Sequence, residues 1–300
     1  MNKELNGIIV INKPKGFTSF DVIAKLRGIL RIKRLGHAGT LDPMATGVLP
    51  VFIGKATKAC DILPNNEKSY KAGFKLGIKT DTQDITGNVV FEEKSCVKLD
   101  ELHDKVKMFL GETEQLPPMY SAVSVGGKRL YELAREGKEV ERKPRKIYVE
   151  SIDITEFDEA SQTGIMEIHC LKGTYVRTII HDLGEALEAG GVLISLERTS
   201  SSGYDISQSH TLDEIQSLMS SGKGIEGIIF PIDSAFYLYE KIILNPKHTR
   251  LYKNGVKLRL EQVGAMGGNT YRVYGSDNEF LGLGLADSKT NEFIIKKNFF

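Results

Sequence analysis

The spacing of apolar residues predicts both strands and helices near the start of the chain. Apolar runs at residues 7–12 and 48–54 are typical of buried strands, and Pro50 predicts that the second is an edge strand or is bent. Between them, residues 18–30 predict an amphipathic helix capped by Thr18, with an apolar face of Val22, Leu26, Ile29 and Leu30.

Further strands and helices intermix up to about residue 191. We expect strands at 68–77, 88–93, 119–125, 145–157 and 164–171, and helices at 100–111, 128–137 and 175–191. Strands and helices do not alternate regularly here. The pattern therefore favours an α+β fold, with a central mixed or antiparallel sheet flanked by helices, over a doubly wound parallel sheet.

The pattern changes near residue 240. From there, strand-like runs at 271–275, 279–286 and 292–300 are separated by turn-like residues, which include the sequence NPKH at 245–248. We therefore predict a large domain over residues 1–239 and a small, β-rich domain over residues 240–300 that is built from strands alone.

The composition is that of an ordinary globular protein. The chain has 300 residues, of which 41% are hydrophobic and 26% charged, and no apolar run approaches the ~18 residues of a membrane span. The N-terminal residues lack a secretory signal pattern, and the three scattered cysteines form neither a disulfide framework nor a metal-binding pair. We therefore expect a cytoplasmic protein with no metal site and no membrane contact.

Charge is nearly balanced overall but unevenly distributed. The formal net charge is +1, yet residues 25–34 hold five bases and no acid, and residues 128–146 hold eight bases and four glutamates. Such clusters can form a phosphate-binding face on a nearly neutral protein. Solvated helix faces would give the same pattern, so charge alone leaves both interpretations open.

Residues 36–50, GHAGTLDPMATGVLP, are the most unusual stretch. Three glycines and two prolines surround one carboxylate, Asp42, directly after the first basic cluster. An Asp before Pro most often forms a turn. Glycines, however, also let the backbone approach a ligand closely, and His37 adds a ring that can stack or donate. The residues themselves leave a simple turn and a catalytic acid as alternatives.

A longer stretch around Asp42, RLGHAGTLDPMATGVLPVFIGKATK, resembles the signature of the bacterial tRNA pseudouridine-55 synthases, the TruB family. Other stretches resemble further blocks of that family, in the same order: GIIVINKPKGFTSFDVIAKLR, KSYKAGFKLGIKTDTQDITG, QLPPMYSAVSVGGKRLYELAREG, CLKGTYVRTIIHDLGEAL, LERTSSSGY and YRVYGSDNEFLGLG. The resemblance covers nearly the whole chain. It implies a pseudouridine synthase domain with an RNA-contacting insertion at about 126–150, followed by a PUA-like RNA-binding domain at 240–300.

The resemblance also implies a reaction. Uridine 55 in the T-loop of tRNA would flip out and be isomerised to pseudouridine: its N-glycosidic bond breaks, the uracil turns, and a bond to carbon forms. Asp42 is the implied covalent nucleophile. The uracil is retained, so no metal or other cofactor is implied. The implied substrate-binding residues are His37, Tyr70, Tyr175, Arg177 and Leu196.

Each implied role has a physical sense and an ordinary alternative. Tyr70 would stack on the uracil, which is worth ~1–3 kcal/mol, but its position also suits a half-buried strand tyrosine. Arg177 would pair with Asp42 through two hydrogen bonds and favour its ionised form; the alternative is a weak surface ion pair. Tyr175 would line the pocket with its ring. Leu196 would form an apolar wall for the base, although most leucines in such a position are plain core. His37 would support the flipped nucleotide.

Two residues depart from the family pattern. Glu197 stands where a second basic residue is common, which puts an RNA contact there in doubt, and Asn12 replaces a frequent Asp. Three other functions stay open: a non-catalytic tRNA-binding or tRNA-folding protein, a subunit of an RNA-guided pseudouridine synthase, and a hydrolytic nucleosidase. The absence of a lysine-rich extension before Phe300 disfavours the second. We expect a monomer that needs no protein partner.

Overall fold

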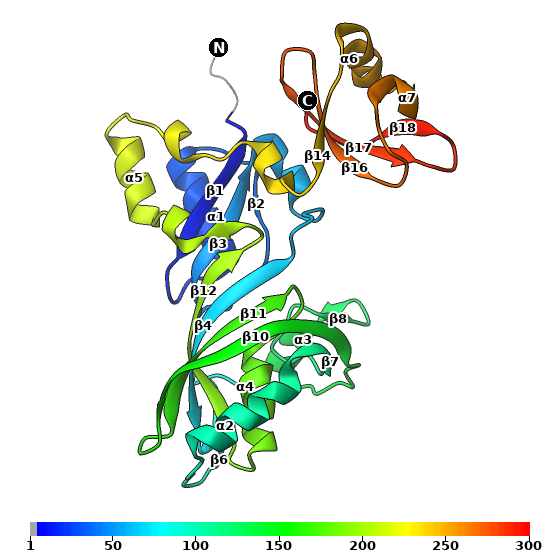
Figure 1. The fold of residues 1–300 in the computed structure, drawn as a ribbon. Helices are drawn as coiled ribbons and strands as arrows, with labels where there is room; N and C mark the ends of the chain where they lie inside the picture. The colour runs from blue at the N-terminus through cyan, green and yellow to red at the C-terminus, as the bar shows by residue number, and fades with distance from the viewer. Residues whose placement is uncertain (1–4) are drawn as a thin grey trace.

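A computed structural model describes residues 5–300, which form a nine-stranded sheet with its helices and a smaller five-stranded sheet (Figure 1). The strands of the large sheet are β1 (Gly7–Lys13), β2 (Leu35–His37), β3 (Thr46–Ile53), β4 (Glu67–Leu76), β7 (Gly111–Gln115), β10 (Arg145–Asp158), β11 (Thr163–Leu171), β12 (Gly191–Ser201) and β13 (Tyr204–Asp205). Their order is β1-β3-β12-β4-β11-β10-β7, with β2 on β3 and β13 on β12.

The large sheet is mixed. β3 and β12 pair in parallel through Thr46–Gly47 and Glu197–Arg198, while the other pairings are antiparallel. The predicted α+β class with a mixed central sheet is therefore confirmed. β4 and β12 are long and pair along most of their length, so they connect the upper half of the sheet in Figure 1 with its lower half.

The upper half combines β1, β2 and β3 with two helices. α1 (Ser19–Leu30) and α5 (Leu212–Ser220) bury apolar side chains against β1 and β3. α1 begins as predicted: Asp21 N donates to Thr18 Oγ1 at 3.0 Å, and Thr18 N donates to Asp21 Oδ2 at 2.8 Å. This capping box fixes the first turn of α1.

The lower half packs its own helices against β4, β10, β11 and β12. α2 (Leu99–Val106) and α4 (Val176–Ala186) enclose a separate apolar core there. A two-stranded hairpin of β5 (Ile78–Thr80) and β6 (Val89–Glu92) follows β4. Short 3₁₀ helices lie at η1 (Gly54–Ala59), η2 (Lys107–Phe109), η3 (Ile206–Gln208), η4 (Glu226–Ile228) and η5 (Ile232–Phe236).

The predicted strand at 119–125 is mostly wrong. Residues 119–122 form bends, and Ser124–Val125 alone pair, as β8, with β9 (Lys128–Arg129). Gly126 and Gly127, both with positive φ, close this hairpin tightly and keep its strands short. The predicted short basic helix follows as α3 (Leu130–Arg135).

Pro50 does not mark a sheet edge, so of the two predicted alternatives, an edge strand or a bent strand, the first is wrong. β3 lies inside the sheet, with β1 on one side and both β2 and β12 on the other. β12 reaches residues 46–47 and β2 reaches residues 51–53, so Pro50 falls between the two. Its missing N–H therefore interrupts no strand pairing on that side.

The C-terminal sheet contains β14 (Glu240–Ile243), β15 (Leu258–Arg259), β16 (Thr270–Tyr274), β17 (Phe280–Asp287) and β18 (Glu292–Asn298). It is not built from strands alone, because α6 (Pro246–Lys253) and α7 (Leu260–Val263) accompany it. The expected NPKH turn is instead a helix start: Asn245 Oδ1 accepts from His248 N at 2.8 Å, and a proline occupies the first helical position.

A shared apolar cluster joins the C-terminal sheet to the upper half. Phe236, Leu283 and Phe299 pack there with Val10 and Phe52 from β1 and β3. Within residues 5–300, no helix combines the length and the apolar character that a membrane crossing requires.

Candidate active site

A cavity of about 1220 Å³ lies between the upper and lower halves of the large sheet. Its volume exceeds the ~300–1,000 Å³ of most small-molecule sites, which leaves room for more than a single base. The structure brings every predicted site residue to its wall: His37, Asp42, Tyr70, Tyr175, Arg177 and Leu196.

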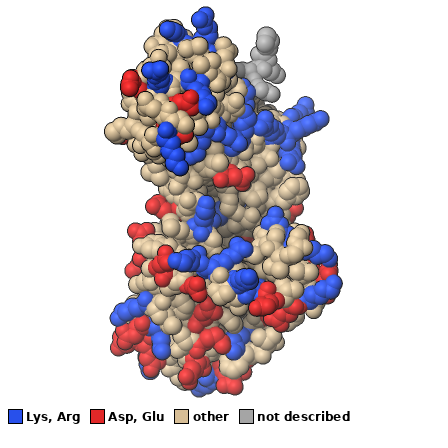
Figure 2. All heavy atoms as spheres, turned by 90° about the vertical axis from the view of Figure 1, so that its right-hand side faces the viewer, with Lys and Arg blue, Asp and Glu red and all other residues tan. Residues whose placement is uncertain are grey.

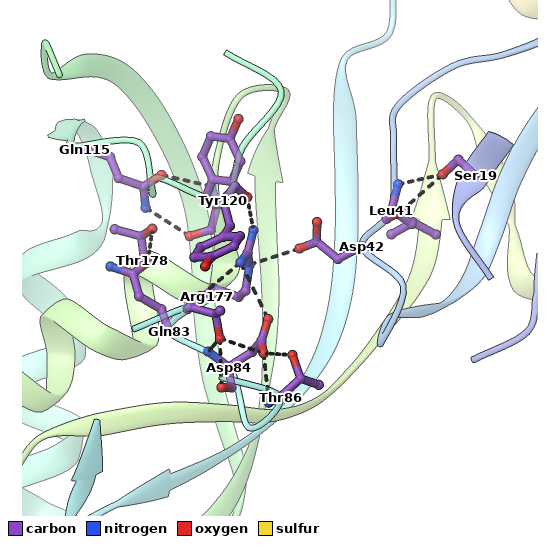
Figure 3. A network of polar contacts seen from close by, with 12 residues as sticks. Ser19, Leu41, Asp42, Gln83, Asp84, Thr86, Gln115, Tyr120, Arg177 and Thr178 are labelled. Atoms are coloured by element: carbon purple, nitrogen blue, oxygen red, sulfur yellow. Dashed lines mark hydrogen bonds and ion pairs between the residues drawn. The ribbon is translucent and has the colours of Figure 1, made fainter. Parts of the chain in front are cut away.

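The backbone around Asp42 is held on both sides. Leu41 N donates to Ser19 Oγ in the first turn of α1, at 2.9 Å, and Gly16 N donates to Pro43 O at 2.7 Å. Figure 3 shows this loop extending the Asp42 carboxylate away from α1 and toward Arg177. These contacts hold the loop, and with it the Asp42 carboxylate, in one position at the cavity.

Arg177, in the first turn of α4, is the central residue of the polar network in Figure 3. Its side chain is only 4% exposed, and its Nε lies 2.9 Å from Asp42 Oδ2. Nη1 donates to Thr82 O at 3.0 Å, and Nη2 donates to Tyr120 O at 2.8 Å. The structure thus pairs Arg177 with Asp42 as predicted, but through Nε and not through two hydrogen bonds, because backbone carbonyls occupy Nη1 and Nη2.

A second acid, Asp84, was not singled out by sequence reasoning. Its Oδ2 lies 3.5 Å from Arg177 Nη1, and its Oδ1 accepts from Thr86 N at 2.9 Å and from Thr82 Oγ1 at 3.0 Å. The signal was available in the loop TDTQDITG, where Thr82 and Thr86 lie two residues on either side of Asp84. Two carboxylates thus flank a single guanidinium.

The site raises the pKa of Asp42. Burial is the largest cause; Arg177 opposes it, Asp84 adds to it, and Lys13 opposes it. The side chain keeps 37% of its surface accessible, so its oxygens can still be reached from the cavity. A carboxylate that is partly desolvated and held in one orientation is suited to attack an electron-poor carbon.

Lys13 is a further site residue that sequence reasoning missed. It ends β1, is fully buried, and donates from Nζ to the carbonyl oxygens of Pro14 and Phe17. Burial lowers the pKa of Lys13 to about 8, although the nearby Asp42 carboxylate opposes that shift. A lysine that directly follows an apolar strand was the signal in the sequence.

Tyr70 and Leu196 supply the less polar part of the wall from β4 and β12. Tyr70 is 6% exposed, and burial raises the pKa of its phenol, so the hydroxyl keeps its proton at neutral pH. Arg198, opposite Tyr70 in the strand register, is wholly buried. It donates from Nε to Val48 O at 2.8 Å and from Nη2 to a second backbone oxygen. The LERTSSSG motif contained this arginine, but its burial was not foreseen.

His37 and Tyr175 occupy other parts of the wall. His37 is at the end of β2, its buried Nδ1 has no hydrogen-bond partner among the described residues, and burial lowers its pKa, which favours a neutral ring. Tyr175 precedes α4, where its backbone N and O pair with the Gln115 side chain at 2.9 and 3.0 Å. Neither departure from the family pattern, Glu197 or Asn12, lines the cavity.

The two basic clusters differ in their relation to the cavity. The five bases of residues 25–34 are exposed on or just after α1, and Arg129 and Arg135 of the second cluster line the cavity itself. Figure 2 shows Lys and Arg gathered over the upper part and the middle of one face, with acids toward its lower end. Among residues 5–300, no group of three or more His, Cys, Asp or Glu side chains is placed to hold a metal ion.

Comparison with known proteins agrees with this geometry. The N-terminal model of the TruB family pseudouridylate synthases matches residues 27–176, and the model of the tRNA pseudouridylate synthase B C-terminal domain matches residues 177–237. A tRNA pseudouridine synthase B from Clostridium kluyveri is 40% identical over 98% of this chain and 100% of its own length. Another, from Clostridium novyi, is 42% identical over 95% and 97%.

Among solved structures, a Cbf5-Nop10-Gar1 complex contains a chain with a TM-score of 0.75 and 26% identity, over 98% of this chain and 85% of that one. The fold, the paired acid and arginine in the cavity, and the two matching family models define a pseudouridine synthase, an isomerase. More narrowly, the chain belongs to the TruB family of tRNA pseudouridine synthases.

Proposed function

We propose that this enzyme isomerises uridine 55 in the T-loop of tRNA, with Asp42 as the covalent nucleophile. The observation that carries the proposal is the contact of 2.9 Å between Asp42 and the buried Arg177, on the wall of a cavity large enough for a flipped nucleotide. Because a stacked uridine hides its reactive faces, the base must leave the loop stack, which costs a few kcal/mol.

In the proposed reaction the Asp42 carboxylate attacks an electron-poor carbon, either uracil C6 or ribose C1′. The bond between N1 and C1′ breaks, the uracil turns, and a bond between C5 and C1′ forms. The bond from the Asp42 oxygen to carbon breaks in turn, which releases the free carboxylate. C5 then loses its proton and N1 gains one, so atoms balance and the mass is unchanged. Arg177 holds the carboxylate in its attacking orientation and favours the ionised form against the effect of burial.

Tyr70, Leu196 and Tyr175 would hold the flipped uracil, and His37 would support the nucleotide as a neutral ring. The stacking of Tyr70 on the base is worth ~1–3 kcal/mol, which helps to offset the cost of flipping. Because its pKa is raised, Tyr70 enters the reaction as a phenol. A role in proton removal at C5 would then require it to lose its own proton first.

The basic clusters and the C-terminal sheet would bind tRNA outside the cavity. The five bases of residues 25–34 are exposed on the upper half, and Arg129 and Arg135 line the cavity from the segment at about 126–150. Phosphate contacts of this kind give salt-dependent affinity. In this proposal residues 240–300 form a PUA-like domain that reads the shape of the folded RNA.

We further propose that the enzyme acts in the cytoplasm, as a monomer, without a protein partner. The similar Cbf5 chain was solved in a complex with Nop10 and Gar1, so dependence on partners is the clearest rival. Modification of a bare tRNA transcript by the purified protein would exclude that rival. If the purified protein were inactive until other proteins were added, this part of the proposal would be wrong.

The central test is tritium release from a T-arm transcript labelled at uridine C5. We expect release by the wild type at a single uridine, position 55, and none by Asp42→Asn. A non-catalytic RNA-binding protein would release no tritium, and a nucleosidase would lower the mass of the RNA by one uracil. Equal release by wild type and Asp42→Asn would remove Asp42 from the mechanism.

A further inference from the structure

Lys68 is a cation of the cavity wall that the proposed mechanism does not use. It lies on β4, two residues before Tyr70, and lines the cavity with a largely buried side chain. Within the described part of the chain, Lys68 Nζ has neither a hydrogen-bond acceptor nor an ion-pair partner. A lysine in such a position normally pairs with a carboxylate or reaches bulk water.

The surroundings of Lys68 are also positive. A methyl group added at Gly39 would lie 3.4 Å from Lys68 Nζ and 3.2 Å from Arg198 Nη1, so both nitrogens flank the same point of the backbone. Arg198 Nη1 is itself buried without a hydrogen-bond partner. The titratable groups that act on Lys68 are the cations Arg198 and Lys172 and the Cys170 thiol, which burial keeps neutral; no carboxylate is among them.

This arrangement has an energetic cost. Burial, and next the charge of Arg198, lower the pKa of Lys68 to about 8. Unpaired charges in a protein wall are unfavourable unless an opposite charge compensates them. The carboxylates of the site, Asp42 and Asp84, are instead engaged by Arg177. Lys68 Nζ is not among the buried atoms without a partner, so its only compensation is solvent in the cavity, and an anionic ligand there would supply the counter-charge that the described side chains do not.

We propose that Lys68 binds a phosphodiester group adjoining the flipped nucleotide, with Arg198 reinforcing the positive potential behind it. The inference rests on the proposed function, because an RNA substrate supplies the phosphate. In this arrangement the two charges of the cavity bind different parts of the RNA. The Asp42 carboxylate contacts the base and ribose, and the Lys68 ammonium contacts the phosphodiester backbone. The cavity volume, larger than a base requires, has room for both.

The test is a binding cycle that combines a protein change with a change in the RNA. Lys68→Met is compared with the parent protein, both in the Asp42→Asn background, so that binding is measured without turnover. The probes are T-arm hairpins with an uncharged methylphosphonate at the phosphate 5′ or 3′ of the target uridine, followed by fluorescence anisotropy. In the parent protein, we expect one of these substitutions to weaken binding by about 10–100-fold, as for a charge-assisted hydrogen bond.

In Lys68→Met, the same methylphosphonate should have little further effect, and the slope of log Kd against log salt should fall by about 0.7–0.9. Lys105→Met is the matched control, because Lys105 is exposed on α2, outside the cavity. That control should keep the full methylphosphonate penalty. A lysine that merely supports the Asp42 loop would also keep it after substitution, and this result would overturn the proposal.

The inference can be refuted even if Lys68→Met does not fold. In that case the hairpins are tested on the parent protein alone, and equal affinity for all three hairpins would contradict a phosphate contact at either position. Its failure is distinguishable from failure of the proposed function. Tritium release by the wild type tests the reaction, whereas the anisotropy cycle tests only where the backbone of the RNA binds.

Discussion

Replacing Arg177 by methionine should be the most informative single change in this enzyme. Methionine keeps much of the volume and helix propensity of arginine but removes every donor. The change leaves Asp42 and Asp84 without their shared cation, and it leaves the carbonyl oxygens of Thr82 and Tyr120 without a donor. Both folding and catalysis should therefore respond.

The stability loss follows from burial. Breaking a buried ion pair by removing one partner costs about 3–5 kcal/mol. Arg177 and Asp84 are 4% and 7% exposed, whereas Asp42 is 37% exposed and is partly screened by solvent. We therefore expect the lower end of that range, about 3 kcal/mol. The loss should be larger at pH 8 than at pH 5, because the pKa of Asp42 is already raised and protonation at low pH neutralises this unpaired carboxylate.

Catalysis should change in a way that structural damage alone would not produce. Burial already raises the pKa of Asp42, and Arg177 is the largest opposing influence. Without Arg177, the pKa of Asp42 rises further, so Asp42 becomes protonated at a higher pH than in the wild type. In single-turnover tritium release, the acid limb of the pH–rate profile should move to higher pH. The rate at neutral pH should fall by about a hundredfold, because the acid is no longer oriented.

Urea denaturation at pH 5 and pH 8, together with the pH–rate profile, checks both parts. Arg250→Met, at an exposed arginine of α6, is the control, and it should change stability by no more than about 0.5 kcal/mol. If Arg177→Met unfolded at the same urea concentration as the wild type and kept the same acid limb, the role assigned to the guanidinium would be refuted.

Two further predictions concern the frame around the site. Gly47→Ala in β3 should destabilise the fold by roughly 3 kcal/mol or more, because φ is 98° and a Cβ would lie 2.3 Å from Arg198 O. In Gly28→Ala, in α1, the added methyl group meets no atom within 4 Å, so the change should stabilise the fold by roughly 0.5–1 kcal/mol. Urea titration of both variants checks this, and the reasoning is wrong if Gly47→Ala is the more stable of the two. For Lys13, the pKa falls from 10.5 in the unfolded chain to about 8 in the folded one, so wild-type stability gains a contribution that grows as the pH rises between these values. Lys13→Met should remove it, and parallel stability–pH curves for the two proteins would contradict the assigned burial.

Local patterns predicted much of the fold. The capping pair at the start of α1 and the apolar spacing of α4 are set by neighbouring residues. α1 forms where expected, and α4 begins where expected but ends at Ala186, before the predicted end at residue 191. The errors arose where contacts between residues far apart in the sequence decide the structure. Pro50 is tolerated inside the sheet because β2 and β12 happen to stop on either side of it. At Asn245, the same residue types serve a turn or a helix cap, and the sequence alone did not separate the two.

The site was predictable only as far as the family resemblance reached. The six implied residues do line one cavity, which spacing alone could not have shown, because Asp42 and Arg177 are far apart in sequence. Asp84, Lys13 and Arg198 were missed since their importance comes from burial and from partners on other elements. Their local signals were an acid among threonines, a lysine after an apolar strand and an arginine in a strand, and none of these signals shows that the side chain is buried.

The long strands β4 and β12 have a mechanical consequence. They cross from the half that carries Asp42 to the half that carries Arg177, joined along nearly their full length. No flexible linker separates the acid from its arginine, so the enzyme cannot clamp its substrate by swinging one half against the other without bending a continuous sheet. Any closure around a bulky RNA is therefore left to parts outside β4 and β12, such as the β8–β9 hairpin with α3, which contributes Arg129 and Arg135 to the cavity wall.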